Sequence, residues 1–134
     1  AFLNHFLKTY NESIKKRRKL ANIYHERLKN IKEVNLPPKP ADNGDYFDIF
    51  QNYEITCDRR NELKDFLKTN GVGTLIQWGG MGIHQLSELG FNQYLPNVDK
   101  FFKNCIMLPM NQFLNDSDIN YITNLIQEFY AKNK

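Results

Sequence analysis

The first thirty residues place apolar side chains at helical spacing, and this pattern constrains the fold more than any other feature. The series runs from Phe2 and Leu3 to Leu28 and Ile31, mostly in steps of three or four residues. A helix of this length measures about 45 Å, whereas a domain of 134 residues has a radius of gyration of about 14 Å. We therefore expect a helix that extends beyond its own domain and needs further protein to cover its Phe-rich first turns.

The helical pattern starts next to Ala1, with no capping residue before it. Residues 34–40 hold three prolines in four positions and cannot continue a helix. We therefore expect a long helix in residues 1–33 that links to an N-terminal domain, and a small domain in residues 34–134. On this interpretation the chain is the C-terminal part of a longer protein, cut within a helix.

Shorter patterns in the rest of the chain predict an α+β fold. Strands are expected in three apolar runs, at residues 46–56, 72–78 and 106–108. Helices are expected at residues 59–69, with Asp58 as the cap, and at residues 83–89 and 96–105. A last helix, capped by Asn115 or Ser117, buries a stripe formed by Ile119, Ile122, Ile126 and Phe129. Together these elements predict a small three-stranded sheet with helices on one face, preceded by the long N-terminal helix.

Length and composition exclude several classes of protein. With 134 residues and 41% hydrophobic residues, the chain can build the core of one domain. No apolar run approaches the length of about 20 residues that crosses a bilayer, so no membrane partner is expected. Cys57 and Cys105 lack the spacing of a metal site, so we expect no metal, and free thiols in a reducing cytoplasm.

A turn with three glycines in four residues is the strongest candidate for a binding site. Gly79, Gly80 and Gly82 lie between Trp78, the single tryptophan of the chain, and His84. Glycines permit positive φ angles and let the backbone come close to a ligand. One interpretation places Trp78 and His84 in a ligand site, and the other makes this a turn that folds Trp78 into the core. The residues by themselves leave both interpretations open.

Residues 15–19 form the single run of charge, with five Lys or Arg in succession. Such a run can bind phosphate groups, and it supports an alternative function: a stand-alone binding module whose basic helix contacts nucleic acid. It can also be a solvated helix face, because no pattern of base-stacking aromatic residues accompanies it. The chain holds no Ser-His-Asp set, no HExxH sequence and no paired carboxylates, so no complete catalytic site is expected within it.

Several short motifs, taken in order, resemble the DegT/DnrJ/EryC1/StrS aminotransferases over essentially the whole chain. They are Ala1-Phe2-Leu3, Arg17-Arg18-Lys19-Leu20-Ala21-x-x-Tyr24-x-x-x-Leu28, Gln51-Asn52-Tyr53-Glu54-Ile55, Arg60-Asn61-Glu62-Leu63, Gly71-Val72-Gly73-Thr74, Leu95-Pro96-Asn97 and Met107-Leu108-Pro109-Met110. The chain departs from the family at Asn61, where Asp is common, and at residues 78–84, which replace a Tyr-Pro-rich segment that ends in His. His84 keeps the position of that His.

The resemblance implies the C-terminal small domain of a fold-type-I aminotransferase that uses pyridoxal phosphate (PLP). In this family the Schiff-base Lys, the Asp at the cofactor ring and the phosphate-binding Ser lie in the N-terminal domain, which would precede Ala1. PLP is therefore expected in the full-length enzyme and not in the chain alone, which should be inactive. The implied substrate-binding residues are Trp78, His84, Gly79 and Gly80, in a lid or wall over the substrate.

The implied reaction transfers an amino group, from glutamate, to a keto-sugar nucleotide, as in polysaccharide biosynthesis in the cytoplasm. The implied partners are the nucleotide sugar, the N-terminal domain of the same protein and a second subunit in a homodimer. Nucleic acid is not an expected partner under this interpretation, and contact with it remains the alternative.

Overall fold

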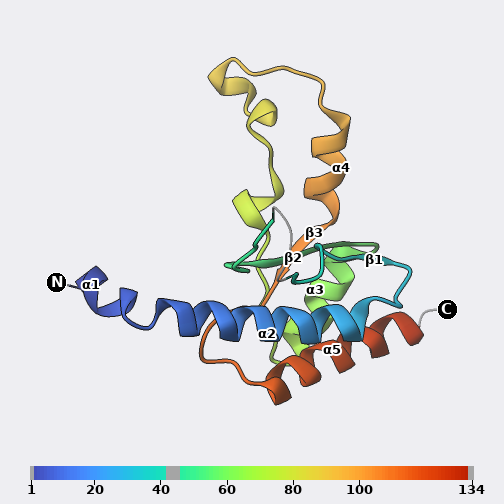
Figure 1. Ribbon diagram of the computed structural model, residues 1–134. Helices are drawn as coiled ribbons and strands as arrows, with labels where there is room; N and C mark the ends of the chain where they lie inside the picture. Colours follow the sequence, from blue (N-terminus) through green and yellow to red (C-terminus); the bar gives the residue numbers. More distant parts are fainter. Residues whose placement is uncertain (1, 42–45, 133–134) are drawn as a thin grey trace.

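The computed structural model describes residues 2–41 and 46–132 (Figure 1). Its helices and strands are α1 (Phe2–Leu7), α2 (Tyr10–Leu28), β1 (Val34–Asn35), β2 (Tyr53–Cys57), α3 (Arg60–Thr69), α4 (Pro96–Asn104), β3 (Cys105–Leu108) and α5 (Asp116–Ala131). Three short 3-10 turns, η1 (Gln77–Gly80), η2 (Ile83–Gln85) and η3 (Ser87–Leu89), lie between α3 and α4. The α+β fold with a three-stranded sheet that the sequence predicts is therefore confirmed.

The sheet is antiparallel, with strands in the order β1-β2-β3. Val34 lies opposite Cys57, and Ile55 lies opposite Ile106. Alternation along β2 buries Tyr53, Ile55 and Cys57 on one face. This buried face meets α2, α3 and α5, and Figure 1 shows α2 and α5 side by side below the sheet. The prediction that helices cover one face is confirmed.

Two of the three strands predicted from the sequence differ from the observed ones. Residues 72–78 do not form a strand, because only Leu75 pairs with β3, through an isolated bridge to Met107. The third strand is instead β1, in residues 34–35, at the start of the proline-containing segment 34–40, where no strand was expected. Pro37 favours extended backbone at Leu36, and the extended segment continues back through Asn35 and Val34, which pair with β2. The predicted strand at residues 46–56 shortens to β2.

The long N-terminal helix is broken. Thr9 leaves helical geometry, with φ −111° and ψ 9°, and its hydroxyl donates to the carbonyl of Phe6 over 3.4 Å. Helix α1 is exposed at Leu3 and Leu7, whereas α2 buries Leu20, Ala21, Tyr24 and Leu28 in the core. Packing therefore supports α2 alone, and the prediction of one helix through residue 31 is wrong. Ala1 and the side chain of Phe2 lie outside the described part of the chain.

Local signals in the second half of the chain agree better with the structure. Asn115 caps α5, because its side-chain oxygen accepts from the backbone N–H groups of Ser117 and Asp118. The predicted apolar stripe of α5 is buried as expected. Asp58 does not cap α3. Arg59 holds that position with φ 56°, and its side chain bonds to Glu62 instead. Residues 83–89, expected as one helix, form the separate turns η2 and η3.

Candidate functional site

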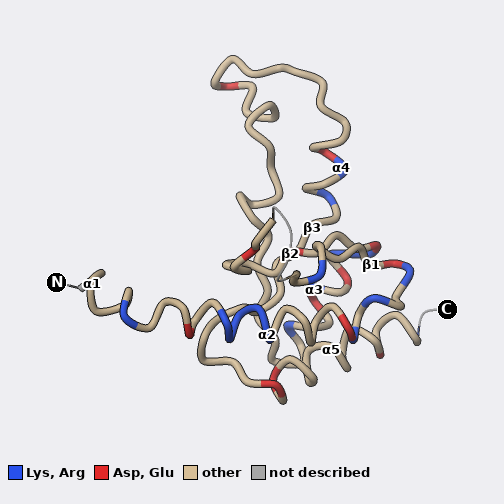
Figure 2. Tube along the Cα trace, in the orientation of Figure 1, with Lys and Arg blue, Asp and Glu red and all other residues tan. Residues whose placement is uncertain are grey.

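Residues 75–95 form an arm that leaves the sheet beside β3 and returns through α4 (Figure 1). Five of its large apolar or aromatic side chains are more than half exposed: Leu75, Trp78, Ile83, Leu89 and Tyr94. Glu88 is the one Asp, Glu, Lys or Arg residue in the arm, and Figure 2 shows the arm almost free of charge. An apolar, uncharged surface of this kind is typical of a surface that other protein or a ligand covers.

The glycine turn at the base of the arm has an unusual backbone. Trp78, Gly79 and Gly80 have φ angles of 52°, 66° and 78°, so three successive residues lie in the left-handed region. Glycine tolerates this conformation, but for Trp78 it costs about 1–2 kcal/mol. The Trp78 side chain is 77% exposed. Trp78 is therefore not part of the core of this chain, and the interpretation that the turn folds Trp78 into the core is wrong for the described structure.

His84 is placed differently from Trp78. Its side chain is 7% exposed, and its Nε2 lies 2.8 Å from Asp99 Oδ1 on α4. Gln85 donates from Nε2 to the same carboxylate oxygen over 2.7 Å, and its own Oε1 accepts from the backbone N–H of Gly82 over 3.1 Å. The structure therefore turns the Trp78 indole toward solvent and binds the His84 imidazole to α4.

Asp99 and Gln85 were not among the residues singled out from the sequence. In the resemblance described above, Leu95-Pro96-Asn97 corresponds to the family's LP-x-x-E, whose acidic position falls on Asp99, so the motif held a signal for it. Its partner could not be identified, because His84 and Asp99 are fifteen residues apart and meet only through tertiary structure.

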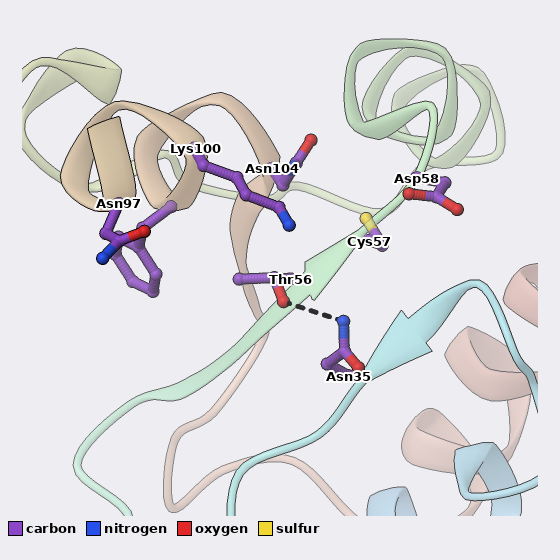
Figure 3. Close-up of a pocket in the computed structure, with 8 residues that line it drawn as sticks. Asn35, Thr56, Cys57, Asp58, Asn97, Lys100 and Asn104 are labelled. Carbon is purple, nitrogen blue, oxygen red and sulfur yellow. Dashed lines mark hydrogen bonds between the residues drawn. The ribbon is translucent and has the colours of Figure 1, made fainter.

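A polar hollow of about 320 Å³ lies between α4 and the edge of the sheet (Figure 3). It is lined by Asn97, Lys100, Phe101 and Asn104 of α4 and by Asn35, Thr56, Cys57 and Asp58. The four residues from α4 are spaced three or four apart and therefore share one face of the helix. A polar face of this kind is usual wherever a helix is exposed to solvent, so it does not by itself indicate a binding site. The hollow holds one ammonium and one carboxylate, so its lining does not select an ion of either sign.

The basic run at residues 15–19 is largely engaged within the molecule. Arg17 donates from Nη1 to the carbonyls of Phe50 and Gln51, and Arg18 donates to those of Asp48 and Ala41. Lys19 pairs with Asp116 over 2.6 Å. Figure 2 shows the run as one blue patch on α2. Because both arginines bind backbone carbonyls, the run does not favour the nucleic-acid alternative.

The hollow beside α4 does not form a complete PLP site. Such a site needs one lysine for the aldehyde and separate groups that neutralise the phosphate. The hollow supplies one cation, Lys100, which cannot do both. Residues 2–41 and 46–132 hold no group of three or more His, Cys, Asp or Glu that could bind a metal. Within the same ranges, no helix has the length and apolar character to span a membrane.

Comparison with known proteins gives a consistent result. Residues 1–127 match the DegT/DnrJ/EryC1/StrS aminotransferase family. A pleiotropic regulatory protein from Geobacillus stearothermophilus is 30% identical over 119 residues, which cover 85% of this chain and 31% of that protein.

Solved structures share the fold. A DegT DnrJ EryC1 StrS aminotransferase from Brucella abortus aligns with a TM-score of 0.79 and 25% identity, over 92% of this chain and 33% of its own. DesV of S. venezuelae, solved with a ketimine intermediate, aligns with a TM-score of 0.86 and 20% identity, over 96% of this chain and 35% of its own. The chain spans about a third of the length of these relatives. It belongs to the DegT/DnrJ/EryC1/StrS aminotransferase family.

Proposed function

We propose that the chain is the C-terminal part of a PLP-dependent sugar aminotransferase and that its arm covers the sugar substrate in the whole enzyme. The observation that carries this proposal is the exposed Trp78 in an arm with a single Asp, Glu, Lys or Arg residue. An exposed indole held by a strained backbone is well suited to stack on a flat or apolar ligand face.

The proposed substrate is a keto-sugar nucleotide. DesI, a structural relative with 21% identity and a TM-score of 0.80 over 95% of this chain and 33% of its own, was solved in the presence of its TDP-sugar product. In this chain the Trp78 ring is proposed to stack on the sugar or the base. The backbone N–H groups of Gly79 and Gly80 are proposed to face the diphosphate oxygens, since left-handed glycine turns can turn successive N–H groups toward an anion.

His84 is proposed to line the inner side of the same site. Its bond to Asp99 holds one ring nitrogen and orients the imidazole. PLP, held by residues outside this chain, would supply the electron sink for amino transfer. The described residues would bind and orient the substrate and exclude water from it, and none of them is assigned a proton-transfer step.

The rest of the proposal concerns the whole enzyme. Residues 1–33 are proposed to link to the N-terminal domain, and residues 34–134 to form the small domain. We further propose glutamate as the amino donor, a homodimer as the assembly and the cytoplasm as the location. The chain alone is expected to bind no PLP and to be inactive.

The test measures steady-state kinetics of the full-length enzyme with Trp78→Ala and Trp78→Phe. A lost stacking contact is worth about 1–3 kcal/mol, or about 5- to 150-fold in kcat/KM. We expect Trp78→Ala to raise KM for the sugar nucleotide more than it lowers kcat, and Trp78→Phe to retain most of the affinity.

Phe113→Ala is the matched control, because Phe113 is also an exposed aromatic side chain but lies outside the arm. It should leave both constants near their wild-type values. If Trp78→Ala keeps wild-type kinetics while the melting temperature falls, the arm does not bind the substrate through Trp78.

A further inference from the structure

The arm is attached to α4 by a small hydrogen-bonded group, and we propose that its centre, Asp99, is a positioning residue for substrate binding. Asp99 would hold the backbone that follows the glycine turn, so that Trp78 keeps the left-handed conformation that exposes its indole. This inference rests on the proposed role of Trp78 and adds a residue that itself touches no substrate.

The conformation of Trp78 needs support from outside its own side chain. A non-glycine residue with φ 52° is strained, and such strain persists only where the surrounding structure enforces it. The indole is mostly exposed, so it makes few contacts that could enforce the strain. The support must therefore come from the residues on either side of the turn.

Before the turn, the support is a pair of backbone hydrogen bonds. Leu75 donates to the carbonyl of Met107 over 3.2 Å, and Met107 donates to the carbonyl of Leu75 over 2.8 Å. These bonds fix the entry of the turn to β3. Within the turn, a Cβ added at Gly80 would lie 3.3 Å from Cγ2 of Ile76 and at an ordinary contact distance of 3.6 Å from the carbonyl oxygen of Phe102.

After the turn, the support converges on Asp99. Its Oδ1 is bonded by His84 and by Gln85, and Gln85 in turn accepts from the N–H of Gly82. Bonds to a carboxylate are about twice as strong as those between neutral groups. Gly82 has no room for a side chain, because an added Cβ would lie 2.5 Å from Cε1 of His84. The backbone at the exit of the turn is therefore fitted to the imidazole that Asp99 holds.

Among the residues that the structure describes, the only side-chain hydrogen bonds between residues 77–95 and α4 are the two that Asp99 accepts. Beyond Gln85, the backbone hydrogen bonds of the arm are local, such as that from Gly90 to the carbonyl of Ser87. Loss of the Asp99 carboxylate would therefore free the exit of the turn while leaving its entry attached to β3.

The experiment uses the full-length holoenzyme labelled with 5-fluorotryptophan. Trp78→Phe identifies the fluorine resonance of Trp78 by its loss. Asp99→Ala should shift or broaden that resonance and raise KM for the sugar nucleotide about tenfold, with a smaller change in kcat. Asp99→Asn keeps the accepting oxygen and should restore most of both properties.

Asp116→Asn is the matched control, since Asp116 makes a surface ion pair with Lys19 far along the chain from the arm. It should change neither the resonance nor KM. Should Asp99→Ala fail to fold, Gln85→Leu removes one of the two donors to Asp99 without changing α4, and the same shift of the resonance and rise in KM are expected.

The results separate this inference from the function on which it rests. A rise in KM for Trp78→Ala combined with wild-type KM for Asp99→Ala or Gln85→Leu overturns the positioning role alone. An unchanged KM for Trp78→Ala overturns the proposed substrate contact itself. Two further outcomes for Asp99→Ala would show a purely structural role and would also overturn the inference. In the first, the fluorine resonance of Trp78 moves while KM stays unchanged. In the second, activity falls only in proportion to the loss of folded protein.

Discussion

Two stacked tyrosines in the core differ in whether their hydroxyl group has a hydrogen-bond partner, and this difference decides how much each hydroxyl contributes to stability. The rings of Tyr24 and Tyr53 lie 4.7 Å apart, and both side chains are buried. Tyr24 donates to the carbonyl of Pro109 over 2.9 Å. The hydroxyl of Tyr53 has no hydrogen-bond partner among the described residues.

We expect Tyr24→Phe and Tyr53→Phe to differ in stability. Tyr24→Phe removes a hydrogen bond and leaves a carbonyl unpaired, so it should cost about 1 kcal/mol. Tyr53→Phe removes an unpaired buried hydroxyl and should be neutral or stabilising. Urea unfolding of both variants measures the difference, and equal losses of free energy would contradict the assignment of partners.

The same residues predict a loss of stability in alkali. Burial raises the pKa of Tyr24 and Tyr53 well above 10, and burial likewise raises the pKa of Tyr130. Unfolded tyrosines release their protons near pH 10. Above that pH the unfolded state binds fewer protons than the folded state, so the free energy of unfolding falls as pH rises. Urea unfolding at a series of pH values should show a steeper fall above about pH 10 in the wild type than in Tyr24→Phe/Tyr53→Phe.

At the scale of elements, Arg17 connects α2 to the chain before β2 and to the chain after β3. Its Nη1 donates to the carbonyls of Phe50 and Gln51, and to that of Met110 over 3.4 Å. Phe50 is buried and has φ 51°, and its N–H donates to the carboxylate of Asp48 over 2.7 Å. The guanidinium thus helps to hold a strained residue at the entry to the sheet.

Substitution of Arg17 should therefore destabilise the protein. Hydrogen bonds to a charged group are worth about 1.5–3 kcal/mol, and Arg17→Ala is expected to cost an amount in this range. Lys16→Ala is the control, because Lys16 is an exposed neighbour on the same helix. Thermal and urea unfolding compare the two variants. An equal, small effect of both would show that the whole run is a solvated face.

At the scale of the whole molecule, two regions of the described chain extend from the core with exposed apolar surface: α1 and the arm. Leu3 is 78% exposed and Leu7 is 65% exposed. In the full-length protein we expect other protein to cover this end. The 134-residue chain by itself should then associate through α1 or leave it frayed.

Sedimentation and amide hydrogen exchange measure this behaviour. Leu3→Gln/Leu7→Gln should reduce self-association and leave the unfolding midpoint unchanged, because neither side chain belongs to the core. A monomeric chain with α1 strongly protected from exchange would show that α1 is stable without a covering surface.

Features that depend on neighbouring residues were determined by the sequence itself. The cap at Asn115, the buried stripe of α5 and the start of α4 at Pro96 follow from contacts within one or two helical turns. The glycine turn was likewise identified as a candidate site from local composition, and its role in substrate binding stays a prediction. Such signals can be read along the chain, because the interacting groups are close in sequence.

Features that depend on distant residues were decided only by tertiary structure. The sequence could not show that residues 34–35, rather than residues 72–78, would form the third strand, because strand pairing joins segments far apart in the chain. It could not show that Trp78 would be exposed while His84 binds Asp99. Packing also decided that α2 ends at Leu28 and that α1 separates from it, since helical periodicity alone does not stabilise a helix that buries nothing.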